Sequence, residues 1–120
     1  KLPRIFHVNW FRKDADGHFL WPGFGDNLRV LEWMLKRIDG SAEGHDTPIG
    51  VVPAAGEINT DGLNLADGAM QTLLAIDSEG WKGELAAIGE YLDSYGAHTP
   101  ARLKAEQQRV AAALDAAANP

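Results

Sequence analysis

The stretch FLWPGFGDNLRVLEW, residues 19–33, decides the fold, because it joins a loop crowded with large rings to the start of a helix. We expect that helix over 26–39, capped by Gly25 or Asp26 and stopped by Gly40. Its apolar positions form one stripe: Leu28, Leu31, Leu35 and Ile38, joined by Val30 and Met34. Large rings therefore lie in a Gly/Pro loop instead of inside an element, and the loop leads directly into an amphipathic helix.

Upstream of this loop, the sequence predicts a β-hairpin. The segment RIFHVNWF, residues 4–11, is rich in β-branched and aromatic residues and is typical of a strand. Asp16-Gly17 is a strong hairpin turn signal, and the HFLW segment at 18–21 supplies the returning strand. Downstream, TPIGVVP at 47–53 suits a short edge strand.

The second half of the chain is predicted to be helical. A short helix is expected near 67–76, and Ser78 opens a longer helix that Gly96 ends. Thr99-Pro100 starts the last helix, so 78–118 forms an antiparallel helical hairpin. The fold class is α+β, as one subdomain over 1–120 with a hairpin and helix at 1–40, a strand and loops at 41–66 and helices at 67–120.

Composition limits the possible partners. The 120 residues are 45% hydrophobic and 23% charged, which is typical of a globular domain. The net charge is −6 and the basic residues are dispersed, which argues against nucleic acid. Cysteine is absent, apolar runs are short and no membrane span is expected, so the predicted location is cytoplasmic. Lys1 is followed closely by an apolar run, so we expect part of a longer protein.

The rings near the loop have two readings. They are contributed by the predicted strands and by the turn into the helix: Trp10, Phe11, Phe19, Trp21 and Phe24. Flat rings at this spacing can sandwich a planar base, where stacking contributes about 1 to 3 kcal/mol per base. The alternative is that they are ordinary core. Gly23 and Gly25, which let backbone approach a ligand, favour the base.

Asn27, in the first helical turn, also has two readings. Its side chain carries both a donor and an acceptor and can read the edge of a base. It can equally be an ordinary helix-capping residue.

Other chemistry finds little support. The DADG segment at 14–17 lacks the further oxygen ligands of a calcium loop and is read as a turn. The four histidines have no metal-ligand spacing. There is no G-x-x-x-x-G-K-[ST] phosphate loop and no serine in a G-x-S-x-G setting. We therefore predict neither a catalytic nor a metal-binding residue in this chain.

The string FHVNWFRKDADGHFLWPGFGDNLRVLEWMLKRIDG, residues 6–40, closely resembles the C-terminal part of GTP-dependent phosphoenolpyruvate carboxykinases. The likeness continues more loosely through TPIGVVP, SEGW and the last two helices. It implies a reversible reaction of oxaloacetate and GTP that gives phosphoenolpyruvate, CO2 and GDP. Manganese and a second divalent cation are implied as cofactors, bound outside this chain. The phosphate loop, manganese ligands and mobile lid also lie upstream, so the chain alone is expected to be inactive.

The resemblance also implies roles for the rings. Phe11 and Phe24 would clamp the two faces of guanine, Phe19 would pack beside it, Asn27 would read its polar edge and Trp10 would line the pocket. The sequence departs from the family at Asp26, where Glu is commoner, and at His18, where Lys is common; neither change removes a ring.

The implied partners are a guanine nucleotide, bound weakly in isolation, and the upstream part of the enzyme. Uncovered apolar surface would also allow self-association. The alternative function is a structural helical module whose rings form core or a docking face, without a ligand.

Overall fold

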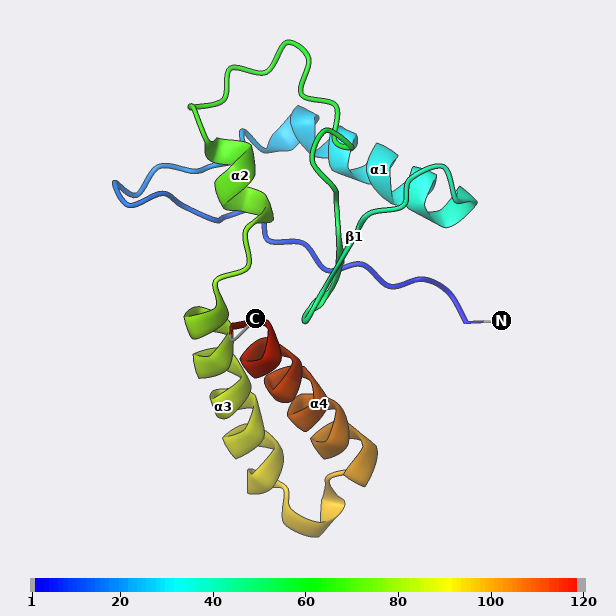
Figure 1. Ribbon diagram of the computed structural model, residues 1–120, viewed down its shortest axis with the longest axis vertical. Helices are drawn as coiled ribbons and strands as arrows, with labels where there is room; N and C mark the ends of the chain where they lie inside the picture. The colour runs from blue at the N-terminus through cyan, green and yellow to red at the C-terminus, as the bar shows by residue number, and fades with distance from the viewer. Residues whose placement is uncertain (1, 119–120) are drawn as a thin grey trace. The chain divides into compact units, whose positions relative to one another are not determined.

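The computed structural model describes residues 2–118, and their contacts divide them into two compact units. The first unit comprises 2–45 with 51–75, and the second comprises 46–50 with 76–118. Helices and one small sheet are both present, which confirms the α+β class (Figure 1). The expectation of a single subdomain over 1–120 stays a prediction.

The helix predicted over 26–39 is confirmed as α1 (Asn27–Asp39), and the 3-10 helix η1 (Phe24–Asp26) leads into it. Gly40 ends α1 in the left-handed conformation, with φ of 89°, and its N–H donates to the Lys36 carbonyl. The leucine-rich stripe of α1 is exposed, whereas Trp33 is buried. The face of α1 that enters the core is therefore the tryptophan face.

The core of the first unit is built around two tryptophans, because a buried indole removes more apolar surface than a leucine. Trp33 of α1 and Trp21 of the ring-rich loop are buried together with Ala42 and Ile58. Half-buried side chains pack around them: Phe6, Trp10, Val30, Met34, Leu63, Met70 and Leu73. The Phe6 ring meets the Trp33 ring edge to face, with centroids 6.1 Å apart.

The predicted N-terminal hairpin is wrong in its strands and right in its turn. Residues 4–11 form no strand, and a single antiparallel bridge joins Lys13 to Phe19. The turn is closed by the N–H of Asp14, which donates to the His18 carbonyl at 2.9 Å. A segment becomes a strand only when its backbone groups are paired. In the part of the chain that the structure describes, the segment 4–11 is instead held through side chains such as Phe6.

The only sheet among residues 2–118 is a small hairpin of β1 (His45–Thr47) and β2 (Gly50–Val52). It takes up most of the segment in which one edge strand was expected. The Thr47 hydroxyl donates to the Gly50 carbonyl at 2.6 Å and closes the turn. The short helix expected at 67–76 is α2 (Ala69–Leu74).

One carboxylate holds the loops of the first unit on α1. Glu57 accepts the indole N–H of Trp33 at 2.8 Å and the backbone N–H groups of Glu43, Gly44 and Ala54 at 3.0 to 3.1 Å. The indole donor, followed by the backbone donors, lowers the pKa of Glu57 from 4.5 to about 2. The carboxylate thus ties three separate segments together.

The second unit contains the predicted helical hairpin, which is confirmed. The two helices α3 (Ser78–Ser94) and α4 (Ala101–Ala118) run antiparallel, joined through η2 (Gly96–His98) (Figure 1). Asp77 caps α3 by accepting the N–H of Gly80 at 3.0 Å. Leu85 and Leu114 are buried between the helices.

Polar contacts fix the register of this hairpin. The side-chain amide of Gln107 donates to the Leu85 carbonyl at 2.9 Å, and Lys104 pairs with Asp93 at 2.5 Å.

Across residues 2–118, no helix combines the length and apolar character that a membrane crossing requires.

Candidate functional site

The rings of the loop separate into a buried and an exposed set. Trp21 exposes 5% of its surface and belongs to the core. In contrast, Phe11 exposes 73%, Phe19 58% and Phe24 98%. Burial is the ordinary fate of a phenylalanine in a domain of this size, so three exposed rings in one short segment are unusual. The hypothesis that the rings are ordinary core is right for Trp21, but it does not describe Phe11, Phe19 and Phe24.

Phe11 and Phe19 form one side of the candidate site. Their centroids are 6.2 Å apart with an interplanar angle of 62°, and the bridge at Lys13 holds their segments together. The Lys13 ammonium lies 5.0 Å from the centroid of the Phe19 ring, within the range of a cation–π contact. The Asn9 side chain accepts the Phe11 N–H at 3.0 Å. Phe11 is thus positioned while most of its ring surface stays open.

Phe24 is the most unusual residue of the segment. It is the only non-glycine residue with positive φ among residues 2–118, at 45°, and it follows Gly23 at φ 77°. A side chain in this region costs about 1 to 2 kcal/mol. Its ring is almost fully exposed, so it is packed neither against Phe11 nor against the core, and no burial among residues 2–118 offsets the strain. Strain of this kind is characteristic of functional positions.

Asn27 is the first residue of α1, but its side chain does not cap the helix. The N-cap position belongs to Asp26, whose side chain makes no capping hydrogen bond. The Asn27 Oδ1 accepts the indole N–H of Trp21 at 3.0 Å. The capping alternative is therefore wrong for Asn27, and base reading stays a prediction.

Arg29 anchors the start of α1 to a distant loop. Its Nε pairs with Asp26 at 3.1 Å, and its two terminal nitrogens donate to the carbonyls of Asn59 and Asp61 at 3.0 and 2.9 Å. The planar fork of arginine suits this geometry, in which one side chain meets three acceptors. The contact fixes the helix start that carries Asn27.

Trp10, the fifth predicted site residue, is half-buried and packs on the core. With Trp21 it lines a small apolar cavity of about 130 Å³, together with Val30, Ile58 and Met70. Trp10 thus lies next to the tryptophan that bonds Asn27.

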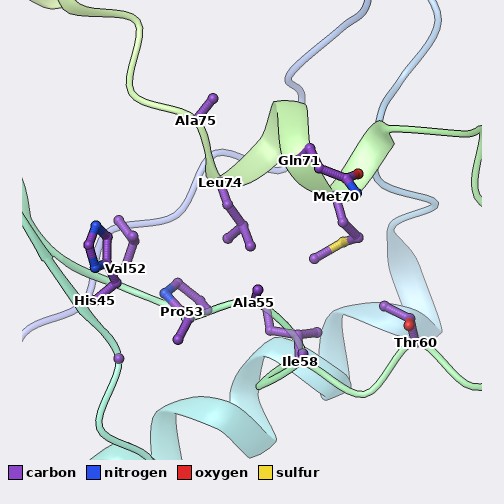
Figure 2. Close-up of a pocket in the computed structure, with 13 residues that line it drawn as sticks. His45, Val52, Pro53, Ala55, Ile58, Thr60, Met70, Gln71, Leu74 and Ala75 are labelled. Atoms are coloured by element: carbon purple, nitrogen blue, oxygen red, sulfur yellow. The ribbon is translucent and has the colours of Figure 1, made fainter.

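A larger cavity of the first unit, of about 590 Å³, lies between the loop 52–60 and α2 (Figure 2). Leu74 and Met70 from α2 and Pro53 and Ile58 from the loop point toward one another across it (Figure 2). Its walls hold neither a phenylalanine nor any of the five predicted site residues. The cavity lacks the flat rings that base stacking needs.

Asp14, Asp16 and His18 come together in the turn before Phe19, with their ligand atoms within 4.8 Å of one another. The turn itself accounts for this, because Asp14 Oδ1 accepts the N–H groups of Asp16 and His18 at 2.9 Å. The His18 N–H is the main cause that lowers the pKa of Asp14. The carboxylate is committed to closing the turn, so we assign no metal to these residues.

Two contacts of the site were not foreseen from the sequence. The Trp21–Asn27 bond joins residues six positions apart, across a short loop and the 3-10 helix η1, and no spacing rule signals it. The Asp26–Arg29 pair has the i, i+3 spacing of a helix ion pair and was open to prediction. The further hydrogen bonds of Arg29 to the carbonyls of Asn59 and Asp61 could not be predicted from sequence spacing.

Comparison with known proteins gives a consistent result. The family model described as "Phosphoenolpyruvate carboxykinase C-terminal P-loop domain" matches residues 1–113. A "Phosphoenolpyruvate carboxykinase [GTP]" of Chlamydia trachomatis serovar D is 50% identical over 115 residues, which cover 95% of this chain. Proteins of the same name from Treponema pallidum and Arthrobacter sp. are 50% and 48% identical, over 86% and 88% of the chain. The aligned part spans 17 to 19% of the length of these relatives.

Proposed function

Since the chain belongs to the family of the phosphoenolpyruvate carboxykinase C-terminal P-loop domain, we propose that it forms the guanine-binding part of a GTP-dependent enzyme of that kind. The activity of the whole enzyme is the conversion of oxaloacetate and GTP to phosphoenolpyruvate, CO2 and GDP. Guanine lies between Phe11 and Phe24, Phe19 packs beside it and Asn27 bonds its polar edge. Trp10 supports the site from the core side.

The observation that carries this proposal is the ring of Phe24. It is 98% exposed on left-handed backbone, directly before the helix that begins with Asn27. A planar ligand stacked on this ring would offset the strain and cover apolar surface that the chain itself leaves in water. The alternative of a purely structural module is not favoured, because the relatives are named for GTP and the three phenylalanines lie outside the core.

The phosphates and metals belong elsewhere in this proposal. Within the 120 residues there is no G-x-x-x-x-G-K-[ST] segment, although the matching family is named for a P-loop. Manganese and a second divalent cation are held by residues outside this chain. The chain contributes affinity for the base, and catalysis depends on groups that it does not carry.

Energetics place the affinity of the isolated site in the weak range. Stacking contributes about 1 to 3 kcal/mol per base and a hydrogen bond about 0.5 to 1.5 kcal/mol. Immobilising a ligand costs about 4 to 15 kcal/mol. The base alone therefore binds weakly.

The test is a titration of the 120-residue chain with guanosine, GDP and GTP, in which the NMR chemical shifts of the backbone amides report binding. A base-only site binds the three with similar affinity, because no group here contacts the phosphates. Shifts are expected at residues 11, 19 and 24 to 27. A strong preference for the triphosphate, or shifts confined to the α3–α4 hairpin, would contradict the proposal.

The exposed stripe of α1 is the proposed contact surface for the rest of the enzyme. It consists of Leu28, Leu31, Leu35 and Ile38, all exposed. Apolar stripes of this kind usually mark an interface. Self-association of the isolated chain through the same stripe follows from the same exposure.

A further inference from the structure

The base-reading residue of the proposed site is held by a residue of the core. The indole Nε1 of Trp21 donates to Oδ1 of Asn27 at 3.0 Å, across the loop that carries Phe24. Trp21 is 5% exposed and packs in the cluster that contains Trp33, Ala42 and Ile58. The position of this indole is therefore set by the hydrophobic core and not by the exposed loop.

This bond decides which end of the Asn27 amide is presented outward. A carboxamide has an acceptor at one end and two donors at the other, and it can turn over to offer either one. An indole N–H is a donor only, so it can bond the oxygen but not the nitrogen. Oδ1 is therefore held on the indole side. Within residues 2–118, the Nδ2 group has no hydrogen-bond partner, and its donors remain for a ligand.

A fixed donor discriminates between purines. Guanine carries acceptors at O6 and N7, whereas adenine carries a donor, the N6 amino group, in place of O6. A donor aimed at position 6 is paired by a 6-oxopurine and meets another donor in a 6-aminopurine. If the amide were free to turn over, its oxygen could accept from the adenine amino group, and the discrimination would fall.

We propose that Trp21 is the positioning residue for base specificity, because its indole N–H locks the Asn27 amide with the donors outward and so selects 6-oxopurines over 6-aminopurines. This inference rests on the proposed function. It assigns Trp21 no contact with the nucleotide.

The experiment compares GDP, IDP and ADP binding to the wild-type chain and to Trp21→Phe, by NMR titration. Phenylalanine keeps an aromatic ring in the core and removes the indole donor, together with the volume of the five-membered ring. We expect wild type to bind GDP and IDP better than ADP, since both 6-oxopurines accept at O6. In Trp21→Phe, the preference over ADP should shrink by about three- to tenfold, the factor that one hydrogen bond corresponds to.

The matched control is Trp33→Phe. Trp33 is a second buried indole of the same core, but its N–H goes to Glu57 and not to Asn27. This variant should lose stability to a similar or greater degree and keep the GDP-to-ADP ratio of wild type. A ratio that falls equally in both variants would reduce Trp21 to a structural role and overturn the inference.

The outcomes separate this inference from the function on which it rests. If wild type prefers GDP and Trp21→Phe keeps that preference in full, Trp21 does not set specificity, while the guanine site stands. If wild type binds ADP as tightly as it binds GDP, the proposed function fails and the inference fails with it.

A second measurement needs no variant and applies even if Trp21→Phe does not fold. In wild type, the Asn27 side-chain NH2 signals should shift with GDP and IDP and much less with ADP. The Trp21 indole proton should stay slow to exchange throughout. Asn27 signals that respond equally to all three nucleotides would overturn the inference.

Discussion

Replacing Phe24 by glycine is expected to weaken GDP binding by about 5- to 150-fold and to leave the fold as stable as before or slightly more stable. The loss of affinity is the stacking contribution of one ring, about 1 to 3 kcal/mol. Stability is not lost, because the ring is 98% exposed and glycine adopts a φ of 45° without strain. Titration with GDP and thermal unfolding of the same sample measure the two effects.

The variant Phe24→Ala is the matched control for the backbone. Alanine removes the ring but keeps a Cβ on left-handed backbone, so affinity should fall as in Phe24→Gly without the gain from relieved strain. The glycine variant should then unfold at a higher temperature than the alanine variant. Unchanged GDP affinity in both variants would remove Phe24 from the site. A large loss of stability in both would mean that the ring packs within the chain.

Replacing Glu57 by glutamine is expected to destabilise the first unit strongly and to remove part of its sensitivity to acid. The carboxylate accepts four N–H groups with its two oxygens, including the buried indole N–H of Trp33. Glutamine has only one acceptor oxygen, and its NH2 group would face N–H donors that it cannot pair. Because folding lowers the pKa of Glu57 from 4.5 to about 2, its stabilising contribution is complete above about pH 4.5. It is lost as the pH falls toward 2. Tryptophan fluorescence during thermal unfolding, between pH 7 and 2, follows the effect.

The control for this prediction is Glu43→Gln, which removes a nearby exposed carboxylate and none of these hydrogen bonds. Its unfolding temperature should follow wild type across the pH range. The gap between wild type and Glu57→Gln should be widest near neutral pH and should narrow below about pH 4.5. A gap that stays constant down to pH 2 would mean that the ionised carboxylate is not what holds the loops.

The helices were predictable because their signals are local. Gly40 stops α1 in left-handed backbone as expected, and the hairpin of α3 and α4 follows from periodicity and from the break at Gly96. Residues 4–11 failed as a strand because β propensity records a tendency that only pairing realises. The same segment supplies Phe6 to the core through its side chain.

The candidate rings could be named from the sequence, but the contacts that position them could not. Exposure separates Phe11 and Phe24 from Trp21, yet all three are large rings in one short stretch, and composition cannot tell them apart. The Trp21–Asn27 bond depends on the path of the loop between them, which no periodicity encodes. Glu57 likewise gathers donors from α1 and from residues 43–44, which are distant in sequence, and from the nearby Ala54, so its role appears only in the folded chain.

The most direct test of the guanine site is the set of nuclear Overhauser effects between the H8 proton of GDP and the aromatic protons of the chain. If the base lies between Phe11 and Phe24, H8 and the ribose H1′ proton should give cross-peaks to the rings of both residues. Cross-peaks to Met70 and Leu74 of the apolar cavity, with none to either phenylalanine, would contradict the account.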